Sequence, residues 1–189
     1  MTTIVVLAGG RGSRLGGNKP LHPWAGSTLI EATIDRLRPQ ADALLINASE
    51  QYTPLSERLA KLGFPLLFDK PETRNRGPLS GVLTALGWAD IQHLQTVITS
   101  PCDMPHLPSD IVERLDKAAD FDAVFFSGRR DYPLCARWHT RLLSKLAPTL
   151  SAAHSGVPVM RFLDDCTVLR LPVEDDAAFA NINTPADVE

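Results

Sequence analysis

A regular alternation of short apolar runs and helix-like segments constrains the fold more than any other feature of the sequence. Six apolar runs of four or five residues read as strands: Ile4–Leu7, Ala43–Ile46, Pro65–Phe68, Thr96–Ser100, Ala123–Ser127 and Thr167–Leu171. Helix-like segments lie between them: Thr28–Arg38, Pro54–Lys61, Pro78–Ala89, Pro108–Ala119 and Thr140–Leu150. Continuous apolar runs indicate strands that are covered on both faces. The pattern therefore predicts an α/β fold with a mostly parallel, doubly wound, Rossmann-like sheet and helices on both faces.

The length of 189 residues suits a single domain that spans residues 1–189. The sequence has no internal repeat, low-complexity tract or linker-like stretch. Two connections are irregular, namely Asp69–Gly77 and Ser151–Val159. The first is polar and long for a connection between elements, which makes it a candidate functional loop.

Charge and cysteine content exclude several classes of protein. The formal net charge is −3, so the chain has no general attraction for nucleic acid or for an anionic membrane. The cysteines, Cys102, Cys135 and Cys166, have neither disulfide-framework nor zinc spacing, and they fit a reducing compartment. The N-terminus lacks a basic region and its apolar run soon reaches glycines, unlike a signal peptide or a membrane span. We therefore expect a cytoplasmic protein that binds any phosphate at a local site.

A glycine-rich segment, LAGGRGSRLGGNKPL from Leu7 to Leu21, follows the first apolar run. Glycines at this place let backbone N–H groups approach a phosphate or a base closely. Arg11, Arg14 and Lys19 add local positive charge that suits phosphate. The segment matches neither the P-loop nor the dinucleotide-binding pattern. The alternative interpretation is a flexible loop with incidental charges.

The segment PCDMPHLP, from Pro101 to Pro108, follows the fourth apolar run. It puts Asp103 just past the carboxyl end of a strand, where open α/β sheets bind their ligands. A single carboxylate there suits Mg²⁺, which takes its other oxygens from substrate phosphates and water. Alternatively, Asp103 caps a helix that begins shortly after it. Its neighbour Cys102 is interpreted as a buried apolar residue, because no histidine is placed to activate its thiol.

Four segments in this order, LAGGRGSRLGGNKPL, RGPLSG, SPCDMPHLP and NINTPAD, resemble the molybdenum cofactor guanylyltransferase family, which has a Rossmann-like nucleotidyltransferase fold. The resemblance runs from Ile4 to Asp187. Enzymes of this family use Mg²⁺ to transfer GMP from GTP to molybdenum-loaded molybdopterin, and they release pyrophosphate. The resemblance implies this activity here, with nucleotide bound by the N-terminal part and molybdopterin by the C-terminal part. It also implies that molybdoenzyme apoproteins or their chaperones receive the product.

The resemblance also implies roles for individual residues. Residues implied to contact the nucleotide are Leu7, Ala8, Gly9, Gly10, Lys19, Asn47, Asp69 and Asp103. Lys19 and Arg14 would stabilise the departing pyrophosphate, while Asp103 and Asn183 would lie at the metal. From the residues alone, Asn47 can equally be a plain turn residue at a strand end, and Asp69 an exposed loop charge.

The chain departs from the family pattern at Asn18, where many relatives carry aspartate, and its segment GRRDYPLCARW matches the acceptor side more loosely. Candidates for binding an anionic acceptor are Arg129, Arg130, Arg161 and Lys145, with an ordinary solvated surface as the alternative. Two other functions remain open. A CTP-dependent molybdopterin cytidylyltransferase would tend to carry Ala-Ala-Gly where this chain has Ala8, Gly9 and Gly10. A non-catalytic nucleotide-binding adaptor is the second.

Overall fold

The computed structural model describes residues 1–9, 18–117 and 120–183, and it contains a seven-stranded sheet in the order β5-β4-β1-β6-β8-β7-β9. The strands of this sheet are β1 (Thr3–Leu7), β4 (Ala43–Ala48), β5 (Leu66–Phe68), β6 (Thr96–Pro101), β7 (Ala123–Ser127), β8 (Asp131–His139) and β9 (Val168–Pro172). A short hairpin, β2 (Pro23–Trp24) with β3 (Ser27–Thr28), lies outside it. All six predicted strands are present, with small differences at their ends.

The sheet is mostly parallel, as predicted. Strands β5, β4, β1 and β6 pair in parallel, and so do β7 and β9. The exception is β8, which pairs antiparallel with both β6 and β7 and was not predicted. Its sequence, DYPLCARWH, contains a proline and charged residues, so it lacks the continuous apolar run of the other inner strands.

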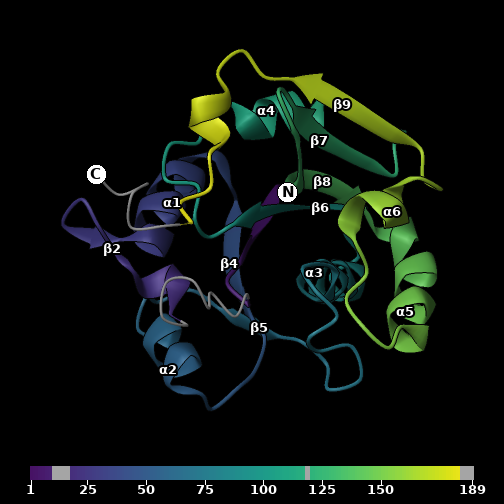
Figure 1. Cartoon of the computed structure of the whole chain (residues 1–189), viewed down its shortest axis with the longest axis horizontal. Coiled ribbons are helices and arrows are strands. Elements are labelled where there is room, and N and C mark those ends of the chain that lie inside the picture. The colour runs from purple at the N-terminus through teal and green to yellow at the C-terminus, as the bar shows by residue number, and fades with distance from the viewer. Residues whose placement is uncertain (10–17, 118–119, 184–189) are drawn as a thin grey trace.

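Helices cover both faces of the sheet (Figure 1). The α-helices are α1 (Leu29–Leu37), α2 (Pro54–Ala60), α3 (Leu79–Ile91), α4 (Ile111–Asp116), α5 (Leu143–Ala152) and α6 (Val159–Leu163). The 3-10 helices are η2 (Lys19–Leu21), η3 (Arg38–Gln40), η4 (Thr140–Leu142) and η5 (Asp176–Phe179). Residues of α1, α2 and α4 belong to one apolar cluster, whereas residues of α3, α5 and α6 belong to the other. This two-sided core confirms the doubly wound architecture.

One helix prediction needs correction. Among its described residues, the segment predicted as a helix over Pro108–Ala119 is helical over Ile111–Asp116, because Ser109 and Asp110 lie in a turn before it. The stretch Ser151–Val159, interpreted as irregular, is irregular over residues 153–158, while its first two residues end α5 and Val159 begins α6. None of the helices in the described ranges is long and apolar enough to cross a membrane.

Local sequence signals fix where α1 and α2 begin. Thr28 accepts a hydrogen bond from the backbone N–H of Glu31, and the Glu31 carboxylate accepts one from the backbone N–H of Thr28. Thr53 and Ser56 form the same reciprocal arrangement at the start of α2. Each of these two capping boxes pairs backbone N–H groups that would otherwise lack a hydrogen-bond partner at the start of the helix.

The parallel pairing brings several strand ends to one edge of the sheet. Leu7 lies opposite Asn47 on one side and opposite Pro101 on the other. The chain that leaves β1, β4, β5 and β6 therefore leaves at the same edge, which is where open α/β sheets bind ligands.

Candidate active site

A compact polar cluster at this edge contains Lys19, Asp103 and Asn183. The Lys19 ammonium forms an ion pair with Asp103 Oδ2 and donates a hydrogen bond to Asn183 Oδ1 at 2.6 Å. The second carboxylate oxygen, Asp103 Oδ1, accepts a hydrogen bond from Asn181 Nδ2 at 2.8 Å. Asp103 is only 5% exposed. The fold thus joins the start of the chain, its middle and its last described residues around one buried carboxylate.

The turn that carries Asp103 is held by α1. The Thr33 hydroxyl donates to the carbonyl of Cys102 at 3.2 Å and accepts from the backbone N–H of Met104, also at 3.2 Å. On the other side, the backbone N–H of Ile182 donates to the carbonyl of Asp103 at 3.0 Å. These contacts fix the carboxylate, and α4 begins only at Ile111. The capping interpretation of Asp103 is therefore wrong.

Cys102 is a packing residue, as expected. It is 7% exposed and belongs to an apolar core cluster. Burial, together with the nearby Asp103 charge, raises the pKa of its thiol far above the ordinary value. A thiol held in the neutral form is a poor nucleophile.

A second buried polar cluster lies beside the first strand ends and contains Asn47, Asp69 and Thr84. Asp69 Oδ1 accepts hydrogen bonds from Asn47 Nδ2 at 2.9 Å and from the Thr84 hydroxyl at 2.8 Å. Asn47 is 1% exposed and Asp69 is 5% exposed. Asn47 is therefore an inner strand residue rather than a turn residue, and Asp69 is not an exposed loop charge.

Burial sets the acidity of this cluster. Desolvation raises the pKa of Asp69 above the ordinary value, and the hydrogen bonds from Asn47 and Thr84 oppose that rise. Because Oδ1 already accepts two hydrogen bonds, Oδ2 is the oxygen with capacity for a further donor. The cluster can thus offer a single, well-oriented acceptor at the edge of the sheet.

At two glycines beside Asn47, an added side chain would require a neighbouring side chain to move. A Cβ added to Gly9 would lie 2.7 Å from Ser49 Oγ and 3.5 Å from Asn47 Oδ1. A Cβ added to Gly81, at the start of α3, would overlap Asn47 Oδ1. Close approach therefore explains Gly9 of the LAGG segment and Gly81 of the RGPLSG segment.

The predicted nucleotide loop is described only in part. The backbone N–H of Ala8 donates to the carbonyl of Asn47 at 2.8 Å, so it is already used within the fold. The carbonyl of Gly9 accepts a hydrogen bond from the Ser49 hydroxyl, and Leu7 ends β1. Gly10 and Arg14, both predicted site residues, lie outside the described residues.

The four predicted acceptor-side cations lie in different surroundings. Arg130 Nη2 is 3.5 Å from Asn181 Oδ1, which links it to the Asp103 cluster. Lys145 instead donates to the carbonyl of Asp165 and lies 5.9 Å from the Phe162 ring. Arg129 is exposed on the β7–β8 turn, and Arg161 is exposed on α6. The structure therefore joins only one of these four residues to the candidate site.

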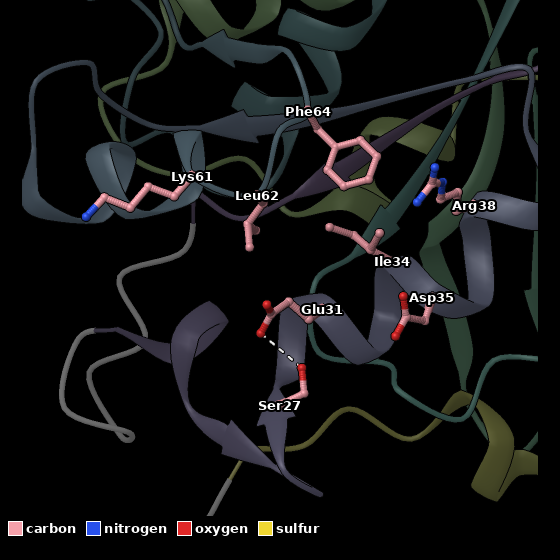
Figure 2. A pocket seen from close by; sticks show the side chains of 8 residues that line it. All are labelled: Ser27, Glu31, Ile34, Asp35, Arg38, Lys61, Leu62 and Phe64. Atoms are coloured by element: carbon pink, nitrogen blue, oxygen red, sulfur yellow. Dashed lines mark hydrogen bonds between the residues drawn. The ribbon is translucent and has the colours of Figure 1, made fainter.

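A surface hollow of about 320 Å³ lies between α1 and the segment that follows α2 (Figure 2). Its lining residues are Ser27, Glu31, Ile34, Asp35, Arg38, Lys61, Leu62 and Phe64. It contains none of the predicted site residues, and its Ser27–Glu31 hydrogen bond of 3.0 Å adds to the capping of α1. The convergent polar groups of the Asp103 cluster are better suited to phosphate chemistry than this mixed surface.

Several contributors to the site were not singled out from the sequence, namely Thr33, Thr84 and Asn181. The threonines lie inside helices and carry no local signal. Asn181 belongs to the NINTPAD segment, in which only Asn183 was given a role. The signal that could have identified Asn181 is its position two residues before Asn183, since the side chains of both asparagines contact the Lys19–Asp103 pair.

Comparison with known proteins identifies the family of the chain. The sequence profile of the MobA-like NTP transferase domain matches residues 4–167. A molybdenum cofactor guanylyltransferase of Rhodopseudomonas palustris is 39% identical, with 99% of this chain and 90% of that protein covered. One from Yersinia pseudotuberculosis is 38% identical, with 99% and 93% covered. Among solved structures, molybdopterin-guanine dinucleotide biosynthesis protein A from Archaeoglobus fulgidus has the same fold, with a TM-score of 0.80, 24% identity and 99% and 95% coverage. The chain therefore belongs to the MobA-like NTP transferase family and is a nucleotidyltransferase, as the resemblance predicted.

Proposed function

We propose that the protein transfers GMP from GTP to molybdenum-loaded molybdopterin, so that the molybdopterin guanine dinucleotide cofactor forms and pyrophosphate is released. The convergence of Lys19, Asp103 and Asn183 at the ligand-binding edge of the sheet carries this proposal. The names of the relatives, which are molybdenum cofactor guanylyltransferases at 36–39% identity, support the choice of nucleotide and acceptor. A cytidylyltransferase is the alternative, and the nucleotide panel below tests it.

The chemistry is one in-line displacement at phosphorus. An oxygen of the acceptor phosphate forms a bond to the α-phosphorus of GTP, and the bond from that phosphorus to the bridging oxygen breaks. Pyrophosphate leaves with the electron pair. The attacking oxygen is already ionised, so no strong general base is needed. The protein's task is to align two anions and to neutralise their charge.

Cationic side chains supply part of that neutralisation. The Lys19 ammonium is held at the edge of the sheet by Asp103 and Asn183, with 16% of its side chain exposed. From there it would contact the triphosphate and stabilise the departing pyrophosphate. We propose the same task for Arg14, which lies outside the described residues.

Asp103 and Asn183 would hold Mg²⁺. Their oxygens both contact the Lys19 ammonium, so they converge on one place that already accommodates a cation. Mg²⁺ suits so small a donor set because it fills its octahedron with water and substrate phosphates. The described residues contain no group of three or more His, Cys, Asp or Glu that could enclose a metal by themselves. When bound, the ion would supply positive charge to the phosphates.

The nucleoside would be recognised by the Asn47–Asp69 cluster. Guanine presents N1–H and an exocyclic amine that need acceptors, and Asp69 Oδ2 can accept one of them. A buried group left without its partner costs roughly 1–3 kcal/mol, which is enough to discriminate between bases. The backbone of Leu7, Ala8, Gly9 and Gly10 would line the remaining side, through groups other than the Ala8 N–H that Asn47 already uses.

The same proposal covers the rest of the chain. We propose one domain over residues 1–189, whose N-terminal part binds nucleotide and whose C-terminal part binds molybdopterin. Molybdoenzyme apoproteins or their chaperones would receive the product. A cytoplasmic location is supported by the free thiols of Cys102, Cys135 and Cys166, which suit a reducing compartment.

Pyrophosphate release tests this proposal. Wild-type protein is assayed with Mg²⁺, molybdate-loaded molybdopterin and each of GTP, CTP, ATP and UTP. We expect release with GTP, and a loss of at least about a hundredfold in Asp103→Ala. Asp35→Ala, which removes an exposed carboxylate on α1, is the matched control and should keep full activity. Release with CTP instead would overturn the base assignment, and no release with any nucleotide would overturn the transfer to this acceptor.

A further inference from the structure

The turn between β7 and β8 is fixed against the C-terminal segment. The backbone N–H of Gly128 donates to the carbonyl of Arg130 at 3.0 Å, and the Ser127 hydroxyl donates to Asp131 at 2.6 Å. A Cβ added to Gly128 would overlap side-chain atoms of Val173 and Asp176, so only glycine fits there. The backbone positions of Arg129 and Arg130, the two arginines of the turn, are therefore fixed.

These neighbouring arginines make different contacts. Arg129 uses its backbone N–H, which donates to Asp176 Oδ1 at 2.9 Å. Arg130 uses its guanidinium, whose central carbon lies 5.2 Å from the centre of the Tyr132 ring. That ring is anchored in turn, because the Tyr132 hydroxyl donates to Asp176 Oδ1 at 2.7 Å. Stacking on an anchored ring restricts the guanidinium of Arg130, which also hydrogen-bonds the Tyr132 hydroxyl.

Asn181 connects Arg130 to the candidate active site. Its Nδ2 donates to Asp103 Oδ1 at 2.8 Å, and its Oδ1 is 3.5 Å from Arg130 Nη2. Lys19 contacts the other oxygen of the same carboxylate. Two cations therefore flank Asp103, one in direct contact with it and one beyond a single asparagine.

The position beyond Asn181 is the one that a second anionic substrate needs. In the displacement described above, the acceptor phosphate must lie beside the α-phosphate of the nucleotide, and both must lie near Asp103. Arg130 is exposed, and none of the ion pairs in the described ranges involves it. The nearby carboxylate of Asp176 accepts hydrogen bonds from Tyr132 and from the backbone of Arg129, and its charge also attracts Arg130. A guanidinium has five N–H donors, so Arg130 keeps donors for a ligand beyond its contacts with Asn181 and Tyr132.

We propose that Arg130 binds the phosphomonoester group of the acceptor and holds it toward Asp103, and this inference rests on the proposed function. A guanidinium can bind two oxygens of a phosphate through parallel hydrogen bonds and leave the third oxygen to attack. The other candidate cations lack this link, because Lys145 is engaged at Asp165 and Arg161 lies on α6. Arg130 is therefore an acceptor-binding residue, whereas Arg129 is part of the turn.

Steady-state kinetics with each substrate varied in turn tests the inference. We expect Arg130→Ala to raise KM for molybdopterin about tenfold or more, because a charge-assisted hydrogen bond is lost. KM for GTP should stay within about twofold of wild type. Arg130→Lys should have a KM for molybdopterin between those of wild type and Arg130→Ala, since lysine keeps the charge but cannot form two parallel hydrogen bonds to a phosphate. Arg129→Ala, which keeps the backbone contact to Asp176, should match wild type.

Calorimetry gives a second readout that does not depend on turnover. Molybdopterin is titrated into each protein loaded with a non-hydrolysable GTP analogue, and we expect weaker binding only in the Arg130 variants. Unchanged acceptor KM and affinity in Arg130→Ala would overturn the inference. A rise in KM for GTP instead would show that Arg130 contacts the triphosphate and not the acceptor. An equal rise in KM for molybdopterin in Arg129→Ala would show that the effect comes from general surface charge and not from a specific contact of Arg130. Failure of wild-type protein to turn over GTP would overturn the proposed function itself, and this inference with it.

Discussion

The two halves of the sheet present their polar groups in opposite ways. Along β1, β4, β5 and β6, all parallel, the residues at the carboxyl edge are buried: Asn47 is 1% exposed, and Asp69 and Asp103 are 5% exposed. On the β7–β8 turn, where the sheet becomes antiparallel, Arg129 and Arg130 are exposed. We infer that the parallel half offers a rigid nucleotide site, whereas the antiparallel half offers an open surface for the acceptor.

Burial makes the first region less tolerant of change than the second. A buried polar group must keep its partner or lose roughly 1–3 kcal/mol, so we expect changes to the buried contacts of the parallel half to lower stability as well as nucleotide binding. An exposed arginine can be replaced with little effect on stability. The comparison is therefore testable by stability as well as by activity.

The largest expected effect on stability comes from adding one methyl group at Gly81. Gly81→Ala places a Cβ against Asn47 Oδ1, and we expect overpacking to cost about 1–3 kcal/mol of the free energy of unfolding. KM for GTP should rise as well, because Asn47 must move. Gly87→Ala, on the same helix with open space around its added Cβ, is the matched control and should stabilise by about 0.5–1 kcal/mol. Equal urea-unfolding midpoints for the two variants would contradict the close packing of Gly81 against Asn47.

A smaller effect is expected at Thr84, which orients Asp69. Thr84→Val removes one of the two hydrogen bonds to Asp69 Oδ1, so we expect KM for GTP to rise about three- to tenfold with kcat nearly unchanged. Thr84→Ser keeps the hydroxyl and should restore most of the affinity. Steady-state kinetics with GTP varied would contradict this role if the serine variant behaved like the valine variant, or if kcat fell alone.

The smallest expected effect is a pH dependence at Asp69. Burial raises the pKa of its carboxyl in the folded state, so the stability that this group contributes at low pH is lost as pH rises from about 4 through the raised value. Asp69→Asn does not ionise. We therefore expect its unfolding free energy, relative to wild type, to increase over that range in urea titrations. A pH-independent difference between the two proteins would contradict the burial of a titrating carboxylate.

Sequence patterns predicted the parallel half better than the antiparallel half. Continuous apolar runs marked β1, β4, β5 and β6, and their shared edge followed from the parallel arrangement. By contrast, β8 carries Pro133 and the charged residue Arg137, yet it lies between β6 and β7 and buries Arg137 to 8% exposure. Tertiary pairing decides such a strand, and the local pattern does not reveal it.

The same distinction applies to the candidate site. Asp103 could be predicted because it follows a recognisable strand, whereas the role of Asp69 was implied by the family resemblance, and the structure brings both to the same edge. Thr33 and Thr84 could not, because their roles come from partners at least 15 positions away in the chain, and Asn181 offered only its spacing from Asn183 as a signal. From the sequence, Arg130 was one of four cationic candidates for binding the acceptor, and only its contact with Asn181 distinguishes it from the other three.

We infer that the parallel half contains two separate functions, with chemistry at Asp103 and base recognition at Asp69. Measuring kcat and KM for GTP and CTP in Asp103→Asn and Asp69→Asn tests this separation. We predict that Asp103→Asn lowers kcat at least about a hundredfold with either nucleotide. Asp69→Asn should lower kcat/KM for GTP about 10- to 100-fold and kcat/KM for CTP much less. The ratio of kcat/KM for GTP to that for CTP should therefore fall. The same loss with both nucleotides in both variants would contradict the separation of the two clusters.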